Sequence, residues 1–258
     1  MNWYKNMQKL KFILLVTCHL LLVTSISACS SNKDIEEPQQ ESAEKLYTRA
    51  HKLLEKGSYT KSAATFEQVE LEHPYSKWAT KAQIMGAYAY YQNQKYDDAI
   101  MSLDRFIRFH PGNSDIAYAY YMKALCYYEQ ITDVRRDQSN TEKALNALYQ
   151  VVSRFPNSDY AKDANVKIDL ANDHLGGKEM EIGRYYLTQR NYLSALNRFS
   201  AVINEYQTTS HIEEALYRQV EIYQILGLSD EAANAHKVLN HNYPNSKWTS
   251  KAAAILKG

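Results

Sequence analysis

One position recurs along the chain and constrains its fold more than any other feature. Pro74, Pro111, Pro156 and Pro244 each follow a histidine or an aromatic residue, and Gln207 takes the same place in a further unit. The intervals from Pro74 to Pro111 and from Gln207 to Pro244 are both 37 residues. Because a proline disfavours the helical conformation of the residue before it, each position predicts the end of a helix. We therefore expect one helical unit repeated about five times.

The residues before each end position share a helical pattern. Twelve residues earlier the side chain is small, and eight, five and one residues earlier it is bulky in almost every unit. Steps of four, three and four place these positions on one face of a helix. The small positions are Ser62, Ala99, Ala144, Ala195 and Ala232. We expect them to let a neighbouring helix approach closely, while the bulky residues fill the contact.

A first helix precedes each of these second helices. A serine shortly after each end position is predicted to cap the helix that follows it. The serines are Ser76, Ser114, Ser158, Ser210 and Ser246. The expected pairs are 43–56 with 59–73, 76–94 with 96–109, 114–133 with 140–155, 159–190 with 192–206, and 210–226 with 229–242, followed by a last helix at 246–257. The fourth unit has the longest first helix, and we expect it to bend at Gly176-Gly177.

This organisation resembles the tetratricopeptide repeat (TPR) family. The resemblance implies an all-α fold, a right-handed superhelical solenoid of about five TPR-like helix pairs with a C-terminal capping helix.

The first residues of the chain resemble a bacterial lipoprotein signal. Lys5, Lys9 and Lys11 precede an apolar run at 12–26 that ends in ISAC. This pattern predicts a signal peptide at 1–28, whether translation starts at Met1 or Met7. The resemblance to a lipobox implies acylation of Cys29 and a flexible tether at 29–42. The alternative is cleavage by the ordinary signal peptidase, with Cys29 as a bystander.

Motifs typical of catalysis, phosphate binding or metal binding are not found in the sequence. The net charge of +1 gives no indication of nucleic-acid binding. The eight glycines are scattered, and no G-x-S-x-G or H-E-x-x-H motif occurs. His73 and His110 share a repeat position and are expected to pack at helix ends, and Cys126 is expected to be a buried apolar residue. We therefore predict a protein that is not an enzyme, without cofactor or metal.

The faces of a solenoid generally bind peptides or partner domains, for which tyrosine and arginine are frequent anchors. In the first half the candidates are Tyr88, Tyr91, Arg105, Arg108, Tyr118, Tyr121 and Lys123, and in the second half Arg184, Tyr185, Arg190, Tyr192 and Arg198. As a set they would suit an extended segment with aromatic side chains and a free carboxylate. The alternative for each tyrosine is packing between helices.

Two stretches, 57–111 and KEMEIGRYYLTQRNYLSALNRF at 178–199, together with the ISAC signal and the long fourth unit, resemble the BamD family. This family supplies a lipoprotein subunit of the outer-membrane β-barrel assembly (BAM) complex.

The BamD resemblance implies an outer-membrane protein assembly factor, lipid-anchored on the periplasmic face of the cell outer membrane. Residues 43–156 would bind unfolded outer-membrane β-barrel proteins, with Tyr88, Tyr91, Arg105 and Arg108 as contacts. Residues 157–258 would dock on a BamA-like barrel, beside other BAM lipoproteins, with Arg184, Tyr185, Arg190 and Arg198 as contacts. The alternative is another outer-membrane TPR lipoprotein scaffold, such as a pilus or secretin pilotin or a scaffold for cell division or peptidoglycan coordination.

Overall fold

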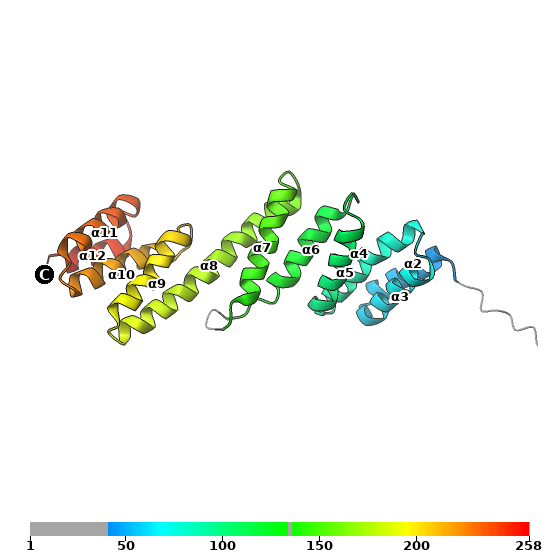
Figure 1. The fold of residues 1–258 in the computed structure, drawn as a ribbon, viewed down its shortest axis with the longest axis horizontal. Coiled ribbons are helices and arrows are strands. Elements are labelled where there is room, and N and C mark those ends of the chain that lie inside the picture. Colours follow the sequence, from blue (N-terminus) through cyan, green and yellow to red (C-terminus); the bar gives the residue numbers. More distant parts are fainter. Residues whose placement is uncertain (1–40, 134–135, 258) are drawn as a thin grey trace, which may run out of the picture. The chain divides into compact units, whose positions relative to one another are not determined.

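The structure, a computed structural model, describes residues 41–133 and 136–257, and in these residues it contains eleven α-helices and no strand (Figure 1). The helices are α2 (Ala43–Glu55), α3 (Tyr59–Glu72), α4 (Lys77–Gln92), α5 (Tyr96–Phe109), α6 (Ile116–Tyr128), α7 (Ser139–Arg154), α8 (Asp159–Thr188), α9 (Tyr192–Glu205), α10 (Ile212–Ile225), α11 (Ser229–Asn242) and α12 (Lys247–Ile255). The predicted signal peptide, the acylation of Cys29 and the tether up to residue 40 lie outside the described residues.

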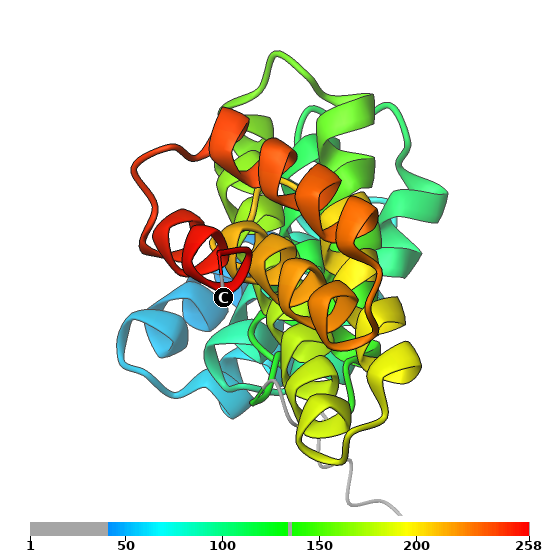
Figure 2. The same cartoon turned by 90° about the vertical axis from the view of Figure 1, so that its left-hand side faces the viewer.

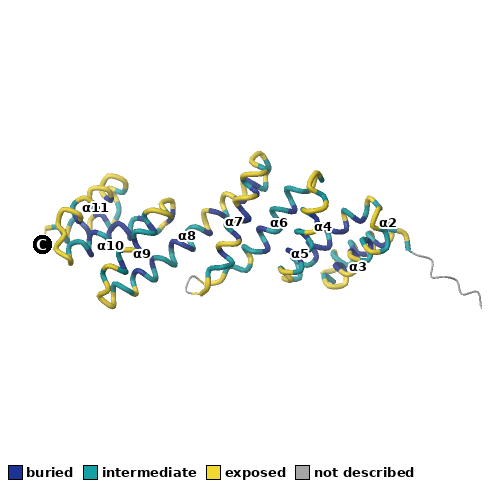
Figure 3. The backbone as a smooth tube through the Cα atoms, in the orientation of Figure 1, coloured by how far each residue is buried: buried dark blue, intermediate teal, exposed yellow. Residues whose placement is uncertain are grey.

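Consecutive helices pack as the predicted pairs, α2 with α3, α4 with α5, α6 with α7, α8 with α9 and α10 with α11. All five small positions of the second helices are fully buried: Ser62, Ala99, Ala144, Ala195 and Ala232. The Ser62 hydroxyl donates to the carbonyl of Ala50 at 2.8 Å, which satisfies this buried polar group. The predicted TPR solenoid is confirmed, and Figure 3 shows the buried positions (dark blue) along the helices with the turns exposed (yellow).

Four of the turns inside the pairs contain a residue in the left-handed region of the backbone. Gly57 and Gly227 have φ of +70° and +75°, where glycine has no side chain to clash. Gln94 and Arg190 adopt φ of 58° and 57° at the equivalent places, although neither is glycine. The backbone geometry of the turn is thus kept even where the sequence offers no glycine signal.

Three of the five predicted serine caps are confirmed. Ser76 and Ser158 each accept a hydrogen bond from the backbone N–H three residues on, at 3.1 Å, and Ser246 accepts from Trp248 N–H at 3.1 Å. The other two predictions are wrong. The helices begin later, at Ile116 and Ile212, so no serine stands at the N-cap position.

The long helix α8 belongs to two hydrophobic cores. Its first part places Ala164 and Ile168 against α6 and α7, and its second part places Met180 against α9 and α10. The predicted weak point at Gly176-Gly177 lies inside an unbroken helix (Figure 1). A Cβ on Gly176 would lie 3.3 Å from Tyr206 and Thr209, so the missing side chain permits close packing.

The predicted capping helix is present as α12, which contacts α10 and α11. Figure 2 faces this end of the chain, with α12 in red beside the orange helices. The Trp248 ring packs on Tyr217 with centroids 5.0 Å apart, and Ala252 is buried in the same cluster. The helix therefore covers apolar surface at the end of the stack.

Candidate functional site

Partly buried tyrosines of the first helices lie near one another in a group that we call the tyrosine row. It comprises Tyr91 of α4, Tyr118 and Tyr121 of α6, and Tyr160 of α8. The rings of Tyr121 and Tyr160 stack with centroids 5.2 Å apart, and Tyr118 lies 5.7 Å from Tyr160. Tyr88 packs against the same core as Tyr91 and Tyr118. Both predicted substrate tyrosines therefore lie at this row.

Carboxylates accompany the tyrosine row. The Tyr91 hydroxyl donates to Glu129 at 3.3 Å, and the Tyr121 hydroxyl donates to Asp163. Burial, with the charge of Glu129, raises the pKa of Tyr91 to about 12, while the Tyr121 hydroxyl lowers the pKa of Asp163. The row therefore offers ring faces and neutral hydroxyls beside two carboxylates, of which Asp163 is also paired with Lys167 at 3.2 Å.

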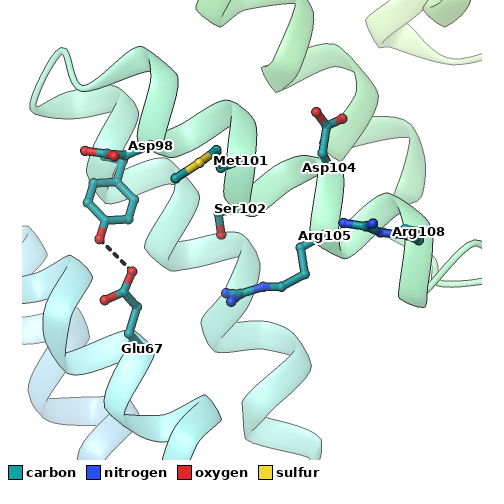
Figure 4. Close-up of a pocket in the computed structure, with 8 residues that line it drawn as sticks. Glu67, Asp98, Met101, Ser102, Asp104, Arg105 and Arg108 are labelled. Atoms are coloured by element: carbon teal, nitrogen blue, oxygen red, sulfur yellow. Dashed lines mark hydrogen bonds between the residues drawn. The ribbon is translucent and has the colours of Figure 1, made fainter.

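The two predicted substrate arginines lie elsewhere, in what we call the α3–α5 groove. This groove is formed by two adjoining hollows of about 500 and 790 Å³, both lined by Glu67 and Arg105. Arg105 pairs with Glu70 of α3 at 2.9 Å, and Arg108 lies over the Phe109 ring at 5.4 Å. Figure 4 shows Arg105 and Arg108 on one side of the first hollow and Glu67 and Asp98 on the other.

Tyr90 explains why neighbouring residues of α4 serve different surfaces. Its hydroxyl donates to Glu67 of α3 at 2.6 Å, whereas Tyr91 reaches Glu129 beyond α6. Tyr90 therefore lines the α3–α5 groove, although it was not among the predicted substrate residues. The four predicted substrate residues are thus divided between two surfaces.

In the C-terminal half, two of the predicted partner residues are held in ion pairs. Arg184 of α8 makes a bidentate contact with Glu214 of α10, at 3.1 and 2.9 Å, and a further bond to Glu181 at 2.8 Å. The hydrogen bond to Glu214 raises the pKa of Arg184 above its usual value. Arg198 of α9 pairs with Glu179 at 3.1 Å. Both arginines therefore join helices to one another.

The other two predicted partner residues are open to solvent at the end of α8. Tyr185 is 61% exposed, and its ring lies 5.7 Å from that of Tyr186. Arg190 is exposed in the turn that follows, where its backbone has φ of 57°. These two side chains are available to a partner without breaking a contact that holds the fold.

The described part of the chain also contains the cysteine and the histidines for which the sequence predicted packing roles. Cys126 is buried, as predicted, and burial raises the pKa of its thiol to about 12. The His110 ring packs on Phe106 at 5.2 Å, which agrees with a helix-end role. Residues 41–133 and 136–257 contain no cluster of three or more potential metal ligands. Within the same ranges no helix combines the length and apolar character needed to span a membrane.

Comparison with known families gives a match over residues 39–239 to YfiO, described as "Outer membrane lipoprotein". This region covers well over half of the chain and includes the tyrosine row, the α3–α5 groove and all of α8.

Several relatives carry the name "Outer membrane protein assembly factor BamD". The protein of Rickettsia prowazekii is 45% identical over 248 residues, which cover 96% of this chain and 98% of the relative. The protein of Caulobacter vibrioides is 44% identical over 239 residues, covering 92% and 78%. That of Neisseria meningitidis serogroup A is 34% identical over 252 residues, covering 94% of each. This chain therefore belongs to the BamD family of outer membrane protein assembly factors.

Proposed function

We propose that this chain is a scaffold anchored by an acylated Cys29 to the outer membrane, on its periplasmic face, where it binds unfolded β-barrel proteins and docks on a BamA-like barrel. The observation that supports this most strongly is the stack of TPR-like helix pairs in a chain of the BamD family. Side surfaces of such a stack are far larger than its core requires. In this mechanism the chain binds its partners and makes or breaks no covalent bond.

The substrate surface in this proposal is the tyrosine row together with Tyr88, and it lies within residues 43–156 except for Tyr160 of α8. Ring faces contact apolar and aromatic side chains, and hydroxyls hydrogen-bond an extended backbone. Arg105 and Arg108 lie in the α3–α5 groove and are left out of this surface.

The surface for the BamA-like barrel is the end of α8, within residues 157–258. Tyr185 and Arg190 supply an exposed aromatic ring and a free guanidinium, which are frequent anchors of protein interfaces. Arg184 and Arg198 act indirectly here, because their ion pairs hold α8 against α10 and α9.

Site-specific photo-crosslinking in cells tests both halves of the proposal. A benzophenone amino acid is placed at Tyr185, at Tyr88, or at Val166, which is 59% exposed on the same helix as Tyr185 and serves as the matched control. Mass spectrometry then identifies the partners of the tagged chain.

We expect Tyr185 to link to a BamA-like barrel and Tyr88 to link to newly made outer-membrane proteins, with little product at Val166. Links from Tyr185 to a secretin or to division proteins, with no BamA-like barrel, would refute the docking assignment. Equal yields from Tyr88 and Val166 would refute the substrate surface.

A further inference from the structure

The α3–α5 groove has exposed apolar side chains that its fold does not require. Leu71 is 83% exposed and Met101 is 68% exposed, and each lines one of the two hollows. In the other units the position of Met101 is taken by Ala64, Asn146, Asn197 and Asn234. The repeat therefore tolerates small or polar residues there, and apolar side chains in this groove indicate a contact surface.

The charges of the groove are unbalanced. Glu70 pairs with Arg105, and Asp104 pairs with Lys123. Glu67, Asp98 and Arg108 also line the first hollow, and none of the three has an ion pair among residues 41–133 and 136–257. With Arg108 included, the acidic side chains still outnumber the basic ones, and Glu67 and Asp98 lie on the side of the hollow away from Arg108. Burial, reinforced by the charge of Glu67, raises the pKa of Glu70 in spite of Arg105. A further cation would therefore be stabilised in this groove.

The Tyr90 hydroxyl lies close enough to both carboxylates to be affected by the charge of each. It donates to Glu67 at 2.6 Å, and burial together with the charges of Glu67 and Asp98 raises the pKa of Tyr90. The phenol stays neutral and occupies one carboxylate oxygen, so it orients Glu67 without compensating its charge.

The fourth unit provides an internal comparison, because a hollow also lies between α8 and α9, the helices that correspond to α4 and α5, although the preceding helix does not line it. That hollow is smaller, about 240 Å³, and has Ser194 and Asn197 at the positions of Asp98 and Met101. Its carboxylate, Glu179, is paired with Arg198 at 3.1 Å. A hollow between the two helices of a pair thus also occurs in this chain with its carboxylate paired and with no apolar residue at the position of Met101.

We propose that the α3–α5 groove binds a basic segment of a partner protein, with an arginine or lysine of that segment beside Glu67 and Asp98 and a neighbouring apolar side chain over Met101 and Leu71. Charge complementarity selects this occupant, since an acidic segment would add to the negative charge. The site is separate from the tyrosine row and from the end of α8, so it would add a third contact surface to the proposed scaffold.

The test uses the full lipidated chain in vesicles of phosphatidylcholine alone, so that basic peptides are not attracted by the lipid. The probes are fluorescent peptides of equal length that alternate leucine with arginine, with glutamate or with glutamine. A benzophenone amino acid is placed at Met101 or, as the matched control, at Asn197 of the fourth unit. Binding is measured by fluorescence anisotropy, and the attachment site by mass spectrometry.

We expect the leucine–arginine peptide to crosslink at Met101 and not at Asn197, and to bind at least tenfold more tightly than the other two peptides. The double change Glu67→Gln with Asp98→Asn should weaken its binding about tenfold, whereas Glu179→Gln should leave it unchanged. Equal crosslinking at the two positions, equal binding of the glutamine peptide, or no effect of the double change would each overturn the proposal. Circular dichroism of each variant establishes that it is folded.

Discussion

Gly183 is the position in this chain where a single methyl group should matter most. It lies buried in α8, and a Cβ added to it would stand 2.5 Å from Cε1 of the Phe199 ring and 2.9 Å from two more ring atoms. Phe199 is fully buried among Met180, Val202 and Ile222. Because the ring is enclosed by these side chains, Gly183→Ala must shift either the Phe199 ring or α8 itself.

Two opposing terms set the size of the effect. Alanine is favoured over glycine inside a helix by about 1 kcal/mol. Overpacking a well-filled core costs about 1–3 kcal/mol, and a clash with three atoms of a buried ring belongs at the upper end of that range. We therefore expect Gly183→Ala to lower the free energy of unfolding by about 2 kcal/mol.

Gly86→Ala is the matched control. Gly86 is also buried in a first helix, but its added Cβ would meet Phe66 Cβ at 3.4 Å, an ordinary contact. The propensity gain should then dominate, and this variant should be more stable by about 0.5–1 kcal/mol. Urea unfolding followed by far-ultraviolet circular dichroism measures both. If the two variants shift the midpoint equally or in the same direction, the reasoning from close packing is refuted.

Two further changes test a cap and an ion-pair network. Ser76→Ala should lower stability by about 1 kcal/mol because the hydroxyl caps α4, whereas Ser114→Ala, which removes no cap, should have almost no effect on the urea midpoint. Glu214→Gln should cost about 1–2 kcal/mol at neutral pH by weakening the contacts with Arg184 and Arg218. Burial alone would raise the pKa of Glu214. Its hydrogen bonds to Arg184 and Arg218 and their charges outweigh this effect, so the pKa of Glu214 lies below its usual value. The stabilisation from ionised Glu214 is therefore fully present above the pKa that Glu214 has in the unfolded chain, and it is lost as the pH falls through its pKa in the folded protein. Unfolding curves of the variant and the parent should converge in acid.

The repeat made most of the fold predictable, because helix pairing depends on side-chain size at fixed intervals. Ala99 and Leu103 are fully buried where the pattern required it, and Pro111 follows the helix end. The ends of α6 were less predictable. It begins at Ile116 and ends at Tyr128, inside the expected range of 114–133. Local composition did not reveal where this helix starts and stops.

The candidate sites were harder to predict, since they depend on which way each side chain of a helix points. Tyr90 and Tyr91 are adjacent in sequence but lie on different surfaces. Their hydrogen bonds to Glu67 and Glu129 show the direction in which each side chain points. A list of aromatic and basic residues cannot separate an arginine such as Arg184, whose charge is used within the fold, from one such as Arg190, which is exposed. Pairing across helices is the information that the sequence lacks.

The unbroken α8 gives the proposed scaffold a fixed dimension. Tyr160 joins the tyrosine row near the start of the helix, and Tyr185 is exposed near its end. At about 1.5 Å per residue, these positions are separated by roughly 37 Å along the axis. Since Ile168 and Met180 anchor the helix in two different cores, this spacing cannot change without disrupting one of them. A substrate on the row and a partner at the end of α8 would therefore be held apart by a rigid element, which can present one to the other without bringing them into competition.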